Sequence, residues 1–189
     1  RVHEYIQLKA LEETHADGLF INPVLGGKKT GDFLSIPIIE SYHLLLESKI
    51  YPKGQVVLGS FSTYSRYCGP REAVFTALCR KNMGCDYFIV GRDHTGVGDF
   101  YETDGNRRLF ESLGELGITP VYFDAIGYDR NSGEYTTKDG SNKLETITAT
   151  RFREAILKGE SVPDWFVRKP VQELLLSELS MGRNIFHGQ

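Results

Sequence analysis

The chain of 189 residues has only three cysteines, and none lies in a Cys-x-x-Cys pair or near a histidine at metal-ligand spacing. We expect Cys68, Cys79 and Cys85 to be reduced thiols. An excess of charge of one sign is also missing, because 22 basic and 25 acidic residues give a net charge of -3. Without a general positive field, binding to nucleic acid or to a membrane surface is not expected, so any anion site must be local.

Long hydrophobic runs are absent as well. No apolar stretch is long enough to span a bilayer, and no secretory leader pattern opens the sequence. These two features predict a cytoplasmic protein. The length is that of about one domain.

Helical and extended patterns alternate along the chain. Helices are expected at residues 3–15, 35–46, 70–84, 107–116, 151–158 and 170–180, and strands at residues 17–24, 55–61, 87–90 and 119–123. Residues 128–142 are polar and rich in turn formers, which indicates a surface loop or a small hairpin. The alternation favours an α/β fold, Rossmann-like in the broad sense, with a mainly parallel sheet, helices on both faces and a small helical segment at the end.

The stretch CDYFIVGRDHTGVGDFY, at residues 85–101, carries the strongest chemical signal. Its apolar run alternates too little for a half-exposed strand and predicts one buried on both faces, as in a parallel sheet covered by helices. Ligands bind beyond the carboxyl ends of such strands. There, glycines let the backbone approach a ligand, Arg92 offers a planar fork of donors for phosphate or sulfate, and His94 can donate to a second anion.

Together with RYCGPREAVFTALCRKNMG at residues 66–84, this stretch resembles the sulfate adenylyltransferase (ATP sulfurylase) family, whose pattern reads RYAGPREA, RKNYGC and FIVGRDHAGVG. The resemblance covers nearly all of the chain and is weakest at residues 128–150. It implies a catalytic domain over residues 1–189, with a Rossmann-like nucleotidyltransferase part at 1–146 and a helical part at 147–189. It also implies adenylyl transfer from ATP, bound with Mg²⁺, to sulfate, giving adenylyl sulfate and pyrophosphate, or the reverse reaction.

The resemblance assigns roles to the segment after the strand. Gly91, Arg92, Asp93 and His94 match the family's GRDH motif, which contributes to nucleotide and sulfate binding. Thr95 stands where the family usually has alanine, whose backbone amide contacts sulfate; the amide survives the change. Arg92 and Thr95 are therefore expected at sulfate, and Arg92 and His94 at the reacting phosphate.

Other candidate residues lie elsewhere in the chain. His3 matches the second histidine of the family's Asn-Pro-x-His-Arg-x-His-Glu motif, beside the triphosphate, and Ile126 falls where main-chain atoms contact adenine. Five residues are expected to support the site: Arg66, Arg71, Glu72, Thr150 and Arg153. For Arg71 and Glu72, a structural ion pair that braces the loop and a direct ligand contact both stay open.

The sequence also departs from the family pattern. It does not contain the family's β-rich N-terminal domain, its first catalytic strand or the Gln-x-Arg-Asn-Pro-x-His run. If the natural polypeptide lacks that run, we expect turnover to be lost; if it contains the run, the expectation reverses. Many relatives carry three cysteines and a histidine as zinc ligands in the loop before residue 147, but YDRNSGEYTTKDGSN at residues 128–142 has neither residue type, so no zinc is expected.

Two alternatives to the enzyme stay open. One is a catalytically silent nucleotide-binding or assembly module derived from the same family. The other is a different nucleotidyltransferase of the same broad fold, which joins AMP to another phosphorylated acceptor. The expected small-molecule partners are ATP, sulfate, adenylyl sulfate and pyrophosphate, and the oligomeric state, including a homo-oligomer, is open.

Overall fold

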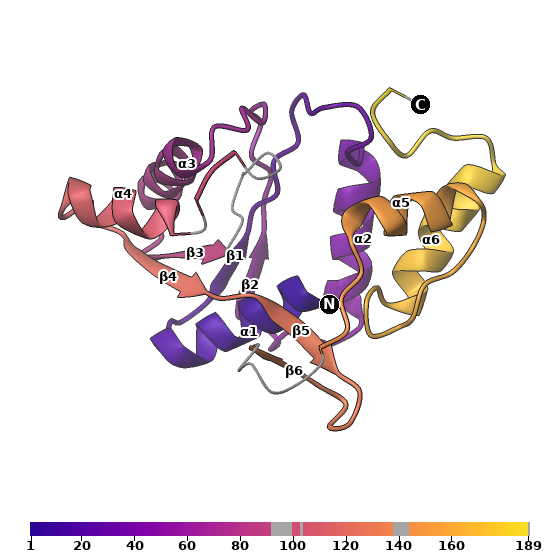
Figure 1. Cartoon of the computed structure of the whole chain (residues 1–189), viewed down its shortest axis with the longest axis horizontal. Helices are drawn as coiled ribbons and strands as arrows, with labels where there is room; N and C mark the ends of the chain where they lie inside the picture. Colours follow the sequence, from indigo (N-terminus) through magenta and orange to yellow (C-terminus); the bar gives the residue numbers. More distant parts are fainter. Residues whose placement is uncertain (92–99, 103, 138–143, 189) are drawn as a thin grey trace.

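The computed structural model describes residues 1–91, 100–102, 104–137 and 144–188 (Figure 1). Helices and strands alternate over most of this part of the chain, so the predicted α/β class is confirmed. The helices are α1 (Val2–Thr14), α2 (Ser35–Glu47), α3 (Pro70–Asn82), α4 (Gly105–Leu113), α5 (Ala149–Leu157) and α6 (Lys169–Ser180). The strands are β1 (Leu19–Ile21), β2 (Val56–Leu58), β3 (Tyr87–Gly91), β4 (Thr119–Phe123), β5 (Ile126–Asp129) and β6 (Glu134–Thr137).

The strands pair two by two, and two of the three pairs in the described residues are parallel. β1 pairs with β2, and β3 pairs with β4 in a register that sets Gly91 opposite Phe123. β5 and β6 form an antiparallel hairpin, so of the two forms predicted from the sequence, a surface loop or a small hairpin, residues 128–137 adopt the hairpin. β1 and β2 are shorter than predicted because Pro23 has no N–H to donate, although its carbonyl accepts from Phe61 N at 3.0 Å.

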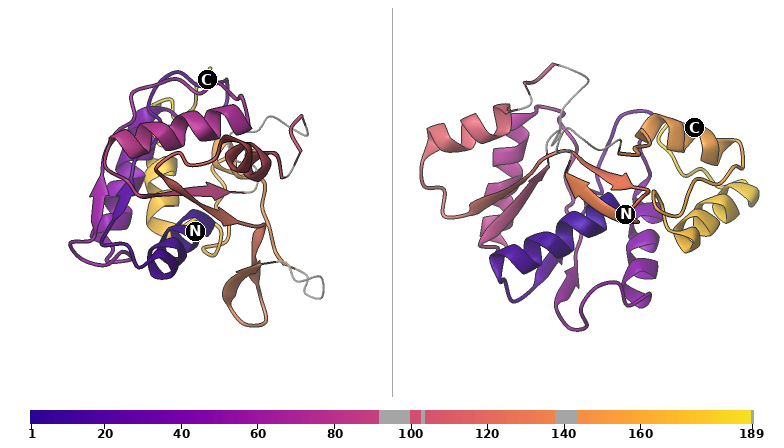
Figure 2. Two further views of the ribbon diagram at one scale, coloured as in Figure 1. Left: turned by 90° about the vertical axis from the view of Figure 1, so that its left-hand side faces the viewer. Right: turned by 60° about the horizontal axis from the view of Figure 1, so that its bottom comes forward.

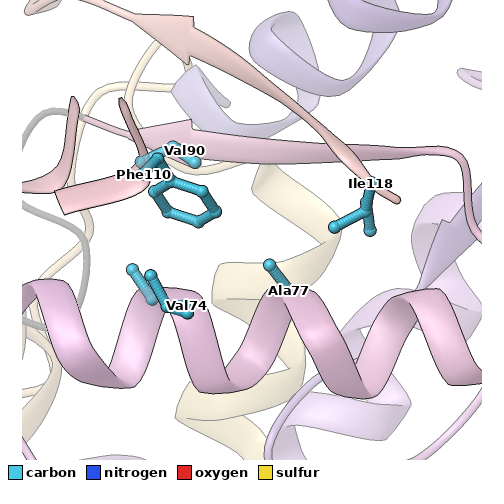
Figure 3. Packing of buried hydrophobic residues seen from close by; sticks show 6 residues of the cluster. Val74, Ala77, Val90, Phe110 and Ile118 are labelled. Atoms are coloured by element: carbon cyan, nitrogen blue, oxygen red, sulfur yellow. The ribbon is translucent and has the colours of Figure 1, made fainter. Parts of the chain in front are cut away.

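The first hydrophobic core lies between β3 and the helices that cover one of its sides. Val74 and Ala77 of α3 face Val90 of β3, Phe110 of α4 and Ile118, as Figure 3 shows. α1 lies on the opposite side of β3 from α3 (Figure 2). The sequence predicted that this strand is buried on both faces. The prediction is right for Val90, which is 1% exposed, but wrong for Tyr87, the first residue of β3, which is 42% exposed.

A second hydrophobic core joins α5, α6 and the C-terminal residues. Its buried members are Phe152, Ile156, Val171, Leu175, Ile185 and Phe186. Leu45 of α2 and Phe33, which lies just before α2, pack against this cluster, so residues from the first half of the chain help to build it. The division of the chain at residue 147 stays a prediction.

Local signals explain where several helices begin. Pro70 follows Gly69, whose φ of 54° suits glycine, and a Cβ there would lie 2.6 Å from the Tyr101 ring. Thr148 caps α5 by accepting from Arg151 N at 3.2 Å. Within the described residues, no helix combines the length and apolar character needed to cross a membrane.

Candidate functional site

The carboxyl end of β3 lies at the rim of a parallel pair of strands. Gly91 is the last residue of β3 and lies opposite Phe123, the last residue of β4. Carboxyl ends of parallel strands meet at one edge, which is where α/β proteins bind ligands. Arg92, Asp93, His94 and Thr95, which were predicted to follow this strand, lie outside the described residues.

Ile126, the residue predicted to contact adenine, begins β5 soon after β4 ends. It is partly buried and pairs with Thr137 in the hairpin. The chain therefore runs from the end of β4 through Ile126 into the hairpin, while Gly91 ends the strand beside β4.

Glu72 organises the RYCGPRE turn from inside the protein. It lies in the first turn of α3, where a carboxylate suits the helix dipole, and is 5% exposed. Its carboxylate accepts hydrogen bonds from Arg66 N at 2.8 Å and from Cys68 N at 3.0 Å. Glu72 thus braces the turn through backbone amides. Arg71, beside it in sequence, is exposed and lines an open pocket of about 610 Å³ with Tyr101 and Arg108.

The Arg66 guanidinium lies between two aromatic rings. Its central carbon is 4.1 Å from the Tyr64 ring centre and 4.5 Å from that of Phe75. It also donates to Tyr64 O at 3.0 Å and to Thr63 Oγ1 at 3.3 Å. These contacts hold the positive charge at the start of the RYCGPRE block, with cation–π attraction to both rings.

Tyr67 ties this block to the glycine-rich loop at residues 26–32. Its hydroxyl donates to Asp32 Oδ2 at 2.6 Å and accepts from Lys29 N at 3.0 Å. Burial and the hydrogen bond to Asp32 raise the pKa of Tyr67. Lys29 Nζ lies 4.9 Å from the Tyr67 ring centre, and burial lowers the pKa of Lys28. The loop therefore places Lys29, with Lys28 next to it in sequence, beside the RYCGPRE block.

The same loop contacts α5 on its other side. A Cβ at Gly31, where φ is 85°, would lie 2.3 Å from Arg153 Nη1, so the loop backbone and this guanidinium are in close contact. Thr150 is exposed near the start of α5. Among the supporting residues, the structure thus connects Arg66 and Glu72 to Arg153 through Tyr67 and the loop. Sequence reasoning missed Tyr67 and Asp32, although Tyr67 stands inside the RYCGPRE motif.

His3 lies in the first turn of α1 and is exposed. Protein packed around part of the ring disfavours the imidazolium form, which lowers the pKa of His3. Within the described residues, no hydrogen bond or ion pair joins His3 to Arg66 or Arg153. The neighbouring residue, Glu4, is buried and binds Arg168.

Comparison with known proteins decides the family. The family model described as ATP-sulfurylase matches residues 1–178, which includes the GRDH segment, the RYCGPRE block and α5. The chain belongs to the ATP-sulfurylase family. The resemblance seen in the sequence is thereby confirmed.

Individual members of the ATP-sulfurylase family match closely. The sulfate adenylyltransferase of Symbiobacterium thermophilum is 42% identical over 185 residues, which cover 95% of this chain and 46% of that protein. That of Thermococcus onnurineus is 43% identical over 179 residues, covering 93% and 46%. The chain therefore spans about half the length of the curated relatives it matches.

A solved structure supports the fold. A chain described as the hexameric APS kinase from Thiobacillus denitrificans superposes with a TM-score of 0.71 at 17% sequence identity, covering 94% of this chain and 34% of that one. At this identity the match shows the α/β fold alone.

Proposed function

We propose that this chain carries the adenylyl-transfer site of a sulfate adenylyltransferase. ATP, with its Mg²⁺, and sulfate would be converted to adenylyl sulfate and pyrophosphate, or the reverse. The observation that carries the proposal is the family match over residues 1–178, which includes the complete GRDH segment. The described geometry supports it, because β3 ends at the residue before Arg92, at a sheet edge suited to ligands.

The reaction needs alignment and charge neutralisation more than covalent chemistry. A sulfate oxygen attacks the α-phosphorus of ATP, and the bond from that phosphorus to the bridging oxygen breaks, so pyrophosphate leaves with the bonding electrons. Both reactants are anions and sulfate is a weak nucleophile. Donors around both oxyanions are therefore required, and no protein nucleophile is needed.

In this proposal, side chains and amides of the chain supply those donors. Arg92 binds sulfate and the reacting phosphate, His94 and His3 bind phosphate oxygens, and the Thr95 amide binds sulfate. Gly91, Asp93 and main-chain atoms of Ile126 bind the nucleotide.

The supporting residues hold the surroundings of the site. Glu72 fixes the turn that carries Arg66 through two backbone hydrogen bonds. Arg153 packs on the loop that Tyr67 holds, and Arg71 and Thr150 are exposed near the starts of α3 and α5. Such rigid support is what an anion site requires, because small displacements of donors cost rate.

The proposal extends to metal, location and assembly. The hairpin and the segment after it contain neither cysteine nor histidine, so we propose that residues 128–142 bind no zinc. A cytoplasmic location fits an ATP-consuming reaction and three reduced cysteines. Whether the protein forms a homo-oligomer can be read from its mass by light scattering in solution.

The first test replaces the two donors of the GRDH segment. Each of Arg92→Ala and His94→Ala should lower sulfate-dependent pyrophosphate release by about 10²-fold or more, because a lost donor at developing charge costs about 3 kcal/mol. Arg130→Ala is the matched control, since Arg130 is an exposed arginine in the β5–β6 turn. Near-normal turnover in either donor variant contradicts the assigned roles.

Calorimetry with ATP, adenylyl sulfate and sulfate then separates the enzyme from its two alternatives. Binding of adenylyl sulfate without turnover indicates the silent module. Turnover that is indifferent to sulfate indicates another nucleotidyltransferase. The assay uses the natural polypeptide that carries this sequence.

A further inference from the structure

Arg168 forms an ion pair with Glu4 in the first turn of α1. It lies at the N-terminal boundary of α6, and its Nε donates to Glu4 Oε2 at 2.7 Å. The side chains are 26% and 10% exposed, respectively, so water screens the pair only weakly. The two residues are 164 positions apart in sequence.

The pair holds the helix turn in which His3 lies. Glu4 directly follows His3, and both belong to the first turn of α1. A buried carboxylate is stable only with a partner, so the position of Arg168 fixes where Glu4, and with it the start of the helix, can lie.

Other contacts of α1 lie farther along the helix than the Glu4–Arg168 ion pair. Gln7 Oε1 accepts from the Tyr51 hydroxyl at 2.6 Å, and the Tyr5 ring lies 5.7 Å from that of Tyr135. These contacts hold the middle of the helix against other elements. The first turn is held by the Glu4–Arg168 ion pair together with Arg1, the residue before the helix, whose Nη1 donates to Asp164 Oδ2 at 2.7 Å. Of the two, the Glu4–Arg168 pair is the one made from within the first turn, and a charged hydrogen bond depends strongly on direction.

We propose that Arg168 is a positioning residue for adenylyl transfer, which orients His3 toward the phosphates through its ion pair with Glu4. The inference rests on the proposed function, since it presumes that His3 contacts the nucleotide. Arg168 itself contacts no substrate in this account. Its removal should lower turnover only as far as it misplaces the imidazole.

Two substitutions test the role. Arg168→Gln removes the cation that lies closest to Glu4, whereas Arg168→Lys keeps the charge but replaces the planar guanidinium with a single ammonium. The matched control is Arg183→Gln. Arg183 also belongs to an ion pair with a buried carboxylate near α6, since its Nη1 donates to Glu178 at 2.8 Å and 3.0 Å.

The first readout is independent of activity. The imidazole signals of His3 are followed by NMR against pH and assigned by their loss in His3→Asn. In Arg168→Gln the signals should shift and the pKa of His3 should rise, because the negative charge of Glu4, which raises that pKa, is then less compensated. In Arg183→Gln they should stay in place. Unchanged His3 signals in a folded Arg168→Gln protein would overturn the inference.

The second readout is a double-mutant cycle on kcat/KM for adenylyl transfer in the natural polypeptide. Arg168→Gln should lower kcat/KM about tenfold in the parent but less than twofold in the His3→Asn background, because its effect passes through His3. Equal effects in both backgrounds would show a general structural role and contradict the proposal. Arg168→Lys should lie between the parent and Arg168→Gln.

The two readouts also separate the inference from the function on which it rests. If the parent releases no pyrophosphate, or if His3→Asn is fully active, the proposed role of His3 fails, while the NMR shift still decides whether Arg168 positions that ring. Circular dichroism identifies a variant that does not fold. In that case Arg168→Lys decides, and His3 signals identical to the parent's would contradict the proposal.

Discussion

Replacement of Glu72 by alanine should destabilise the protein strongly, because the buried carboxylate holds the RYCGPRE turn together. The carboxylate is 5% exposed and accepts hydrogen bonds from two backbone amides, Arg66 N at 2.8 Å and Cys68 N at 3.0 Å. The substitution leaves both donors without their acceptor inside the protein. The RYCGPRE turn would lose the group that closes it.

The expected magnitude follows from these two bonds. Hydrogen bonds to a charged group contribute about 1.5 to 3 kcal/mol each, so the loss of both should lower the free energy of unfolding by about 3 to 6 kcal/mol. Glu72→Gln keeps one oxygen acceptor but turns an NH₂ group toward the other amide. It should therefore cost about half as much.

Urea unfolding followed by circular dichroism measures the difference. With a slope of about 2 kcal/mol per molar urea, the midpoint of Glu72→Ala should fall by about 1.5 to 3 M. Glu173→Ala is the control, because Glu173 is an exposed glutamate whose ion pair with Lys169 spans 3.8 Å, and it should change the free energy by about 0.5 kcal/mol or less. A midpoint for Glu72→Ala equal to that of the control would refute the reasoning.

Three further predictions concern the loop and α1. Tyr67→Phe removes the hydroxyl that donates to Asp32 at 2.6 Å and should lower the free energy of unfolding, measured by urea titration, by about 1.5 kcal/mol. An unchanged free energy of unfolding would show that this hydrogen bond does not hold the loop. Gly26→Ala would place a Cβ 1.9 Å from Thr63 O, so its thermal midpoint should fall by roughly 10 °C, and a normal midpoint would show that the loop can move away. Because the pKa of His3 is lowered from 6.5, the unfolded chain binds more protons below that pH, so stability should fall as pH drops below 6.5 and this component should vanish in His3→Asn.

Much of the fold could be predicted because its signals are local. The strand predicted at residues 119–123 is β4 without change, and the helix that begins at Pro70 does so because proline tolerates the first turn. Turn formers at residues 128–142 indicated a surface loop or a small hairpin, and β5 and β6 form the hairpin. The predicted strands at residues 17–24 and 55–61 were too long, because Pro23 interrupts donation along the ladder.

The contacts that support the site could not be predicted because they join distant residues. Nothing near Glu4 in sequence indicates Arg168, and nothing near Asp32 indicates Tyr67. The partner of Glu72 was open between an ion pair and a ligand, yet the carboxylate binds backbone amides, which leave no mark on side-chain identity. The second core could not be predicted for the same reason. Phe33 and Phe186 are far apart in sequence, yet their ring centres lie 4.5 Å apart.

The central claim is that this chain positions ATP and sulfate for direct transfer. The most direct measurement is pyrophosphate release by the natural polypeptide with ATP and Mg²⁺, in the presence and absence of sulfate. We predict release that requires sulfate, with adenylyl sulfate formed in equal amount and both lost in Arg92→Ala. Release that does not depend on sulfate, or adenylyl sulfate formation that survives in Arg92→Ala, would contradict the account.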